Sequence, residues 1–180
     1  MSTAALLHFV TNLKSRHESV RLKTVKELSL YVKNELREAT PDEINSFLDE
    51  FYHHIFEMVK FNNDVNEKKG GILAIMCLIG ADVGDTTSRF GRFANYLRKL
   101  LPCNDVGVME LVAKAMGYLA MVYGSKASEY VQFEVKRAFE WLQDDKADAQ
   151  LHHGQEESHS NPLLCELVDY TVEQVCKQTM

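Results

Sequence analysis

The sequence lacks the short motifs that mark the common catalytic classes. It contains no GxGxxG or GxxxxGK[ST] phosphate-binding loop, no GxSxG or HExxH, and no HRD or DFG. Its carboxylate pairs, such as Asp49 with Glu50, lie in polar stretches where solvation is the ordinary role. We therefore expect no catalytic residue, no cofactor-binding residue and no cofactor.

Cysteine and histidine are scarce and scattered. The cysteines, none in a CxxC pair, are Cys77, Cys103, Cys165 and Cys176. The histidines with a close neighbour are the pair His53 and His54 and the group His152, His153 and His159. Adjacent residues point about 100° apart on a helix, and no spacing in either set matches a zinc template. Reduced thiols and no metal site are therefore expected.

Basic residues are too few for a broad basic face. Residues 143–180 contain eight acidic residues and two lysines, so they account for the whole net charge of -6, and residues 1–142 have 18 of each sign. Nucleic acid is therefore not an expected partner. One local cluster comprises Arg89, Arg92, Arg98 and Lys99. We interpret it as a solvated helix face, with salt-sensitive nucleic-acid binding as the alternative.

Long apolar runs and a secretory leader are also missing. The start MSTAALLHFVTNLKSR has no charged n-region or small-residue cleavage site. The longest uninterrupted apolar run, Ile72 to Ile79, is far shorter than the roughly 20 residues of a membrane span. We expect a cytoplasmic chain without direct membrane insertion.

Only three prolines and nine glycines interrupt a chain that is 46% hydrophobic, which leaves room for long helices. Apolar residues recur at helical spacing from Thr3 to Leu13, and Thr40-Pro41-Asp42-Glu43 has the pattern of a capping box. The predicted helices span 3–13, 17–36, 41–61, 64–79, 89–101, 104–122 and 127–142, with a loop over 80–88. In the second helix the charged residues, Arg21 among them, are expected to face outward.

Two neighbouring glycines, Gly70 and Gly71, lie inside the fourth predicted helix. Each costs roughly 1 kcal/mol relative to alanine in a helix interior. We interpret the pair as a place where a neighbouring helix approaches closely.

One apolar pattern occurs three times. Frames that start at His17, Asp64 and Asp105 have apolar residues at positions +8, +11 and +14, and they start 47 and 41 residues apart. This spacing is typical of HEAT-type helical hairpins, which stack to share one core. The predicted fold is all-α, an α-solenoid of about three hairpins. A fourth hairpin is represented by its first helix alone, over 127–142.

The pattern stops after residue 142. Residues 1–142 are therefore predicted to form the solenoid segment, and 143–180 a divergent acidic tail that is disordered or has a short helix near 162–176. A solenoid needs a polar cap at its end. We expect self-association through the exposed apolar face near Phe139 unless the tail covers it.

Several segments closely resemble the extreme N-terminus of the target of rapamycin (TOR) serine/threonine protein kinases. The most specific are NEKKGGILAIMCLIG and RFGRFANYLRKLLPCNDVGVMELVAKAMGYLAM, and the likeness extends from about Val10 to Asp148. The resemblance implies a HEAT scaffold that contributes to dimer architecture and docks the raptor subunit. It implies protein partners, namely a raptor-type subunit and TOR itself, and a parent complex that is recruited to endomembranes.

No residue matches the family's ATP-binding or catalytic motifs, so none is carried over as catalytic. The sequence departs from the family where a fourth repeat should continue, at QLHHGQEESHSNPLL. We interpret the chain as a noncatalytic scaffold fragment in TOR growth and nutrient signalling. The alternative is an incomplete gene model of an active TOR kinase, in which the tail is an alternative exon, a frameshift or an error.

Overall fold

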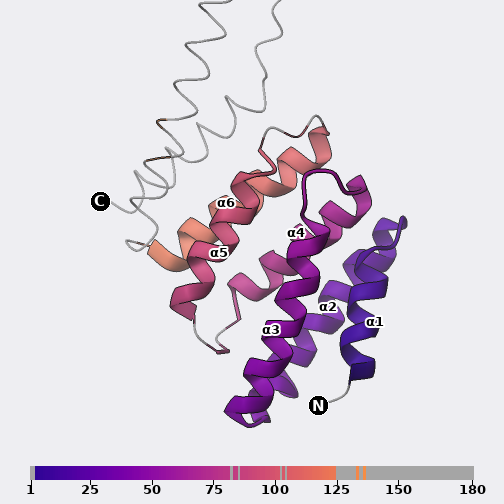
Figure 1. The fold of residues 1–180 in the computed structure, drawn as a ribbon, viewed down its shortest axis with the longest axis vertical. Coiled ribbons are helices and arrows are strands. Elements are labelled where there is room, and N and C mark those ends of the chain that lie inside the picture. The colour runs from indigo at the N-terminus through magenta and orange to yellow at the C-terminus, as the bar shows by residue number, and fades with distance from the viewer. Residues whose placement is uncertain are drawn as a thin grey trace, which may run out of the picture. The chain divides into compact units, whose positions relative to one another are not determined.

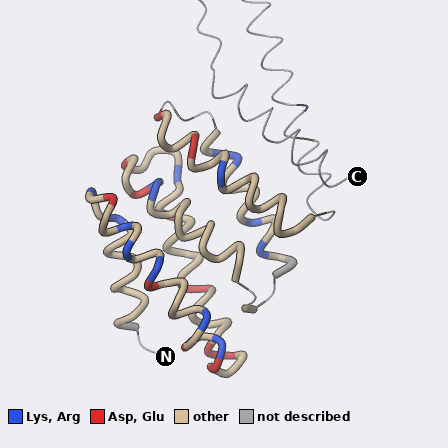
Figure 2. The backbone as a smooth tube through the Cα atoms, turned by 180° about the vertical axis from the view of Figure 1, so that it is seen from behind, with Lys and Arg blue, Asp and Glu red and all other residues tan. Residues whose placement is uncertain are grey.

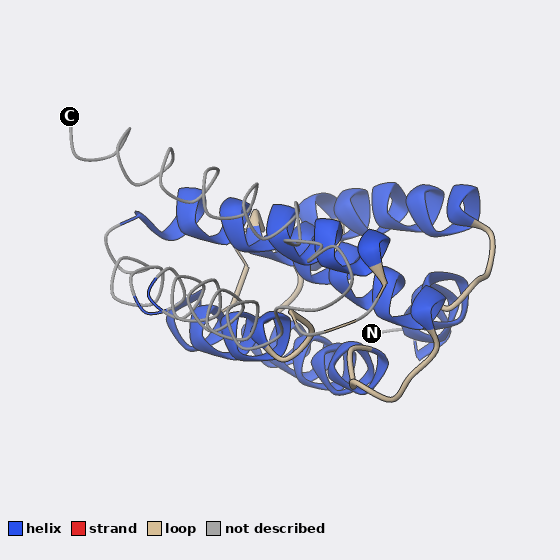
Figure 3. Ribbon diagram, turned by 90° about the horizontal axis from the view of Figure 1, so that it is seen from above, coloured by secondary structure: helices blue, strands red, loops and turns tan. Residues whose placement is uncertain are grey.

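Six α-helices joined by short connections form the part of the chain that the computed structural model describes, residues 3–81, 83–84, 86–101, 103, 105–124, 133 and 136 (Figure 3). The helices are α1 (Thr3–Leu13), α2 (Glu18–Asn34), α3 (Pro41–Met58), α4 (Val65–Ile79), α5 (Thr86–Arg98) and α6 (Val106–Tyr123). A short 3-10 helix, η1 (Leu36–Glu38), follows α2. No strand occurs in these ranges, and the predicted all-α class is confirmed.

The helices follow one another as three hairpins, α1 with α2, α3 with α4, and α5 with α6 (Figure 1). Helix α1 packs on α3 and α2 packs on α4, so equivalent helices of the first two hairpins are neighbours. Helix α4 also contacts α5, which joins the third hairpin to the second. This is the stacking of an α-solenoid, as the repeat frame predicted.

The chain divides into two compact units, Met1–Val122 and Tyr123–Met180. The three hairpins belong to the first unit. Within the predicted helix 127–142 only Phe133 and Lys136 are described, and both are helical. The boundary at 142, the acidic tail and the helix near 162–176 lie outside the described residues and remain predictions.

The central hairpin is the most completely buried. The three frame positions of α4, Ile72, Ile75 and Leu78, have 0% exposure. The equivalent positions in α2 and α6 include half-buried residues, such as Val25 and Met116. Helix α4 is covered by α2 and also meets α6, since an added Cβ at Gly80 would overlap the hydroxyl of Tyr118. Each hairpin therefore depends on its neighbours for its core.

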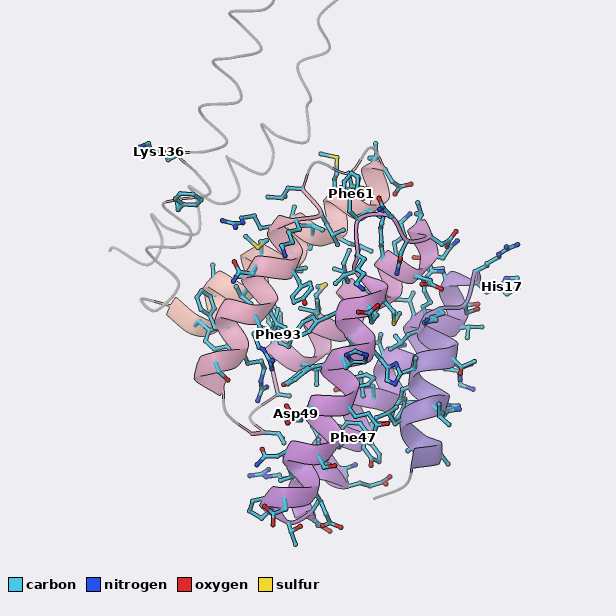
Figure 4. The ribbon with its side chains drawn as sticks, in the orientation of Figure 1. His17, Phe47, Asp49, Phe61, Phe93 and Lys136 are labelled. Atoms are coloured by element: carbon cyan, nitrogen blue, oxygen red, sulfur yellow. The ribbon has the colours of Figure 1, made fainter. Side chains whose placement is uncertain are left out.

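Helix α3 presents aromatic residues to both neighbouring hairpins. Towards α1 and α2, Phe47 stacks on Phe51 at 5.5 Å between ring centroids, and Phe51 lies 6.4 Å from Phe9. Towards α5, the ring centroid of Tyr52 lies 5.6 Å from that of Phe93. Figure 4 labels Phe93 on α5 and Phe47 on α3. The wide apolar stripe expected for this helix is thus packed on two sides.

The predicted capping box starts α3. The backbone N–H of Glu43 donates to Thr40 Oγ1 at 3.4 Å, and the backbone N–H of Thr40 donates to Glu43 Oε2 at 3.0 Å. This second hydrogen bond is the main cause that lowers the pKa of Glu43. Pro41 occupies the first turn, where its missing N–H costs nothing.

Replacing Thr40 with alanine should lower the free energy of unfolding by about 1 kcal/mol, because an N–H at the start of α3 loses its acceptor. Thr11→Ala, an exposed change inside α1, serves as the control. Urea unfolding of both variants measures the difference. Equal midpoints for the two variants would show that the box adds no stability.

Gly70 and Gly71 are the close contacts that the sequence predicted. An added Cβ at Gly70 would overlap the carbonyl oxygen of Leu13 at the end of α1. At Gly71 it would lie 2.6 Å from Val59 Cγ1, just beyond the end of α3. The first helices of two hairpins therefore approach α4 at neighbouring glycines.

Helix α5 begins at Thr86, although the sequence analysis predicted a loop up to residue 88. The first turn of a helix is commonly polar, so apolar periodicity misses it, whereas Asp85-Thr86 is itself a typical start signal. The helix also ends at Arg98 rather than Leu101. The predicted boundaries of this helix were wrong by three residues at each end.

Candidate interaction surface

The residues tested as metal ligands do not come together in the described part of the chain. The rings of His53 and His54 have centroids 5.9 Å apart on α3, at exposed or half-exposed positions. No group of three or more His, Cys, Asp or Glu side chains that could hold a metal occurs among the described residues. The other tested set, His152, His153, His159, Cys165 and Cys176, lies outside them.

The two described cysteines are free thiols in different environments. Cys77 is half-buried on α4, and burial raises the pKa of its thiol to about 11, although hydrogen bonding from Ser29 opposes the shift. Cys103 is buried in the connection between α5 and α6. Cys77 is thus the more accessible of these two thiols.

Arg89 is buried rather than solvated. Its side chain is 2% exposed, and Nη1 donates to the carbonyl oxygens of Leu78 at 3.0 Å and Ala81 at 2.8 Å. Nη2 donates to the carbonyl oxygen of Val83. These carbonyls lie at the end of α4 and in the connection to α5, where one guanidinium donates to all three, and the carbonyl of Leu78 also accepts the backbone N–H of Ala81. The prediction that Arg89 lies on a solvated face or a nucleic-acid patch was wrong.

Two other members of the predicted basic cluster lie against aromatic rings. Arg92 Cζ lies 5.9 Å from the ring centroid of Phe56, and Lys99 Nζ lies 5.3 Å from that of Tyr96. Phe56 and Tyr96 stack at 4.0 Å with an interplanar angle of 3°. We call these four residues, Phe56, Arg92, Tyr96 and Lys99, the α5 patch.

The α5 patch carries unbalanced positive charge. Arg92 and Lys99 are exposed, and neither has a carboxylate within 4.0 Å among the described residues. Along the helices in general, basic and acidic positions are interspersed (Figure 2). Cations beside aromatic faces suit the binding of an acidic group next to an apolar one.

A second set of polar contacts joins consecutive hairpins. Arg21 is 5% exposed, and its Nη1 donates to the carbonyl oxygen of Ser15 at 2.7 Å and to Asn66 Oδ1 at 3.2 Å. Lys69 Nζ lies 3.2 Å from Asp105 Oδ1. Each basic residue therefore reaches the start of the next hairpin's second helix. The predicted outward orientation of Arg21 was wrong, because its long side chain bends back to the carbonyl oxygen of Ser15 in the connection between α1 and α2.

Asp105 caps α6 as well as pairing with Lys69. The backbone N–H of Val108 donates to Asp105 Oδ1 at 2.8 Å. This hydrogen bond is the main cause that lowers the pKa of Asp105, and Lys69 lowers it further. Asp105, which starts the third copy of the repeated pattern, thus caps a helix and also forms a contact between hairpins.

Asp105→Asn should make the unfolding free energy less sensitive to acid. Because the folded pKa of Asp105 is lowered, its ionisation contributes stability above the unfolded pKa, and this contribution is lost as pH falls through the folded pKa. The wild type should be more stable by roughly 0.5 kcal/mol at pH 7 and show no advantage at pH 2. Thermal unfolding at both pH values measures this, and an advantage unchanged at pH 2 would contradict it.

Helix α6 is long and apolar enough to cross a membrane by length and composition, with 22% of its residues buried. It contains no long uninterrupted apolar run, because Glu110 and Lys114 divide the helix. Those two charges near its middle would each cost about 3 kcal/mol in a bilayer. Val108, Val112 and Leu119 are buried in the first unit, as expected for a helix packed in a solenoid.

Three stacked helical hairpins define the class of this protein as an α-solenoid. Similarity to known proteins extends that description. The chain is 44% identical over 153 residues to serine/threonine-protein kinase mTor of Drosophila melanogaster, 38% over 142 residues to tor1 of Schizosaccharomyces pombe, and 34% over 132 residues to TOR2 of Saccharomyces cerevisiae. The matches cover 84%, 79% and 72% of this chain.

Over this segment the chain is similar to the TOR serine/threonine-protein kinases, as a fragment of such a protein would be, and this match confirms the resemblance noted in the sequence. It spans only 5–6% of the length of these relatives. No family model matches the chain, and no solved structure matches it.

Proposed function

We propose that this chain is a noncatalytic HEAT-type scaffold segment of a TOR serine/threonine kinase, acting as a protein-protein interaction module in TOR growth and nutrient signalling. The observation that carries the proposal is the match to TOR kinases over a segment that amounts to 5–6% of their length. A segment of that size made of stacked hairpins offers surface rather than an active site.

The described residues support a binding role in two ways. Two of their buried polar side chains, Arg21 and Arg89, are engaged in holding hairpins and connections together. In the α5 patch two exposed cations, Arg92 and Lys99, lie beside aromatic rings. An acidic segment of a partner protein would gain from its charge and from its aromatic rings.

The proposed partners are a raptor-type subunit and TOR itself, in the cytoplasm. Pull-down of the full chain with each purified partner tests the proposal. Arg92→Glu combined with Lys99→Glu should weaken the captured complex by about tenfold, because the exposed charges of the α5 patch are reversed. The control reverses two exposed charges on α2, Lys26→Glu with Lys33→Glu, and should change capture by less than about twofold.

The outcomes distinguish the partner-binding role of the chain from the role of the α5 patch in that binding. Absence of binding to both partners would overturn the partner-binding role and leave the fold intact. Equal losses in the two double variants would show that a general charge effect, not the α5 patch, controls capture.

A further inference from the structure

Lys68 and Cys103 form a buried pair between consecutive hairpins. Lys68, in the first turns of α4, is 6% exposed, and Cys103, in the connection before α6, is 7% exposed. Lys68 Nζ lies 4.0 Å from Cys103 Sγ. A lysine side chain and a free thiol thus face each other where water and large reagents have little access.

The position of Lys68 is not explained by an ion pair. Its other recorded neighbour is the ring of Phe61, with Nζ 5.5 Å from the centroid. No carboxylate of the described residues lies within 4.0 Å of it, whereas the next residue, Lys69, pairs with Asp105 at 3.2 Å. Lysine is seldom buried without a charged partner. The contact with the thiol is therefore the distinctive feature of this side chain.

The usual oxidised forms of a cysteine fit Cys103 poorly. The other described cysteine, Cys77, lies nine residues beyond Lys68 on α4, about 13 Å along the helix axis, too far for a disulfide with a thiol beside Lys68. Burial also hinders a bulky thiol such as glutathione. Hydrogen peroxide is small enough to reach a buried sulfur, and oxidation to sulfenic acid would place an oxygen between Sγ and Nζ.

We propose that Lys68 and Cys103 form a covalent N–O–S cross-link when the protein is exposed to peroxide. In the first step the thiol sulfur attacks one peroxide oxygen, the O–O bond breaks, and Cys103 sulfenic acid and one water form. In the second step a further peroxide accepts two electrons as the N–O bond forms between Lys68 and the sulfenic oxygen. The amine and the sulfenic acid each lose one proton, and two waters form.

The cross-link would join the second hairpin to the third. It closes a loop from residue 68 to residue 103, which contains most of α4, all of α5 and the connections beside it. Cross-links of this length restrict the unfolded chain and stabilise the folded one. Oxidation should therefore raise the Tm of the full chain by roughly 5–10 °C.

Peroxide treatment of the full chain, followed by alkylation, digestion and tandem mass spectrometry, tests the proposal. The expected product links the peptides that contain Lys68 and Cys103, with one oxygen gained and two hydrogens lost, and dithiothreitol reverses it. Lys68→Arg and Cys103→Ser should abolish both the product and the rise in Tm. The matched controls Lys69→Arg and Cys77→Ser should retain both.

Circular dichroism confirms that each variant folds, and the wild-type fragmentation map is decisive even if a variant does not. Oxidation of Cys103 to sulfinic acid without a link would overturn the proposal. So would a link that maps to Lys69, or a product that persists in Lys68→Arg.

Discussion

Gly70→Ala is expected to destabilise the first unit by about 3 kcal/mol or more, although alanine is the better helix former. The added Cβ would overlap the backbone carbonyl of Leu13, and a main-chain atom at the end of α1 has no alternative rotamer. Either α1 moves away from α4 or α4 shifts within its hairpin. Urea unfolding of the full chain measures the loss.

Gly91→Ala provides the matched control. Gly91 also lies inside a helix, α5, but an added Cβ there has no atom within 4 Å. The substitution should therefore stabilise the protein by about 0.5–1 kcal/mol through helix propensity alone. Opposite signs of the change in unfolding free energy at the two glycines would distinguish the effect of packing from that of helix propensity. A stabilising effect at both positions would show that α1 does not approach α4 as closely as the structure indicates.

Arg89→Met should cost roughly 3–5 kcal/mol, because three carbonyl groups, at the end of α4 and in the connection to α5, lose a charged donor that is itself buried. Methionine keeps much of the volume, so the loss reports on hydrogen bonding rather than on a cavity. Arg89→Lys should recover part of the stability, since one ammonium group cannot reach all three acceptors with the planar geometry of a guanidinium. Thermal unfolding of the full chain measures both effects.

Arg92→Met is the control for Arg89, because Arg92 is an exposed arginine three residues further along α5. Its removal should change the unfolding free energy by less than about 0.5 kcal/mol. Similar losses for the two arginines would contradict the role of Arg89 as the residue that holds the connection from α4 to α5.

The helices could be predicted because their signals are local. Thr40 to Glu43 supplies a complete start, and the repeated frame predicted three second helices, the central one with all three of its frame positions buried. The glycine pair was also interpretable, since two glycines inside a helix are costly unless a neighbour needs the space.

Arginine orientation could not be predicted in the same way. Arg21 and Arg89 each lie on a helix whose pattern counts them as outward polar residues, yet their long side chains reach backbone carbonyls in a preceding turn or connection. Those carbonyls come close to the arginine side chains only when the chain reverses direction between two helices. The α5 patch was found in part by its charges, but its ring partner Phe56 comes from the preceding hairpin.

Lys68 and Cys103 gave no sequence signal, because 35 residues separate them and neither belongs to a motif. Their proximity depends on how the second hairpin meets the third. The same is true of Lys69 and Asp105, where only the aspartate was recognised, as a helix start.

The close approaches to α4 have a consequence for an array longer than three hairpins. Gly70 faces α1 near the start of the helix, and Gly80 faces Tyr118 of α6 just after its end. These two contacts fix the tilt of the central hairpin against the one before it and the one after it. In a repeat protein a small rotation at one junction is carried through every later unit. A single methyl group at Gly70 or Gly80 would therefore change superhelical pitch, and with it the position of surfaces many hairpins away.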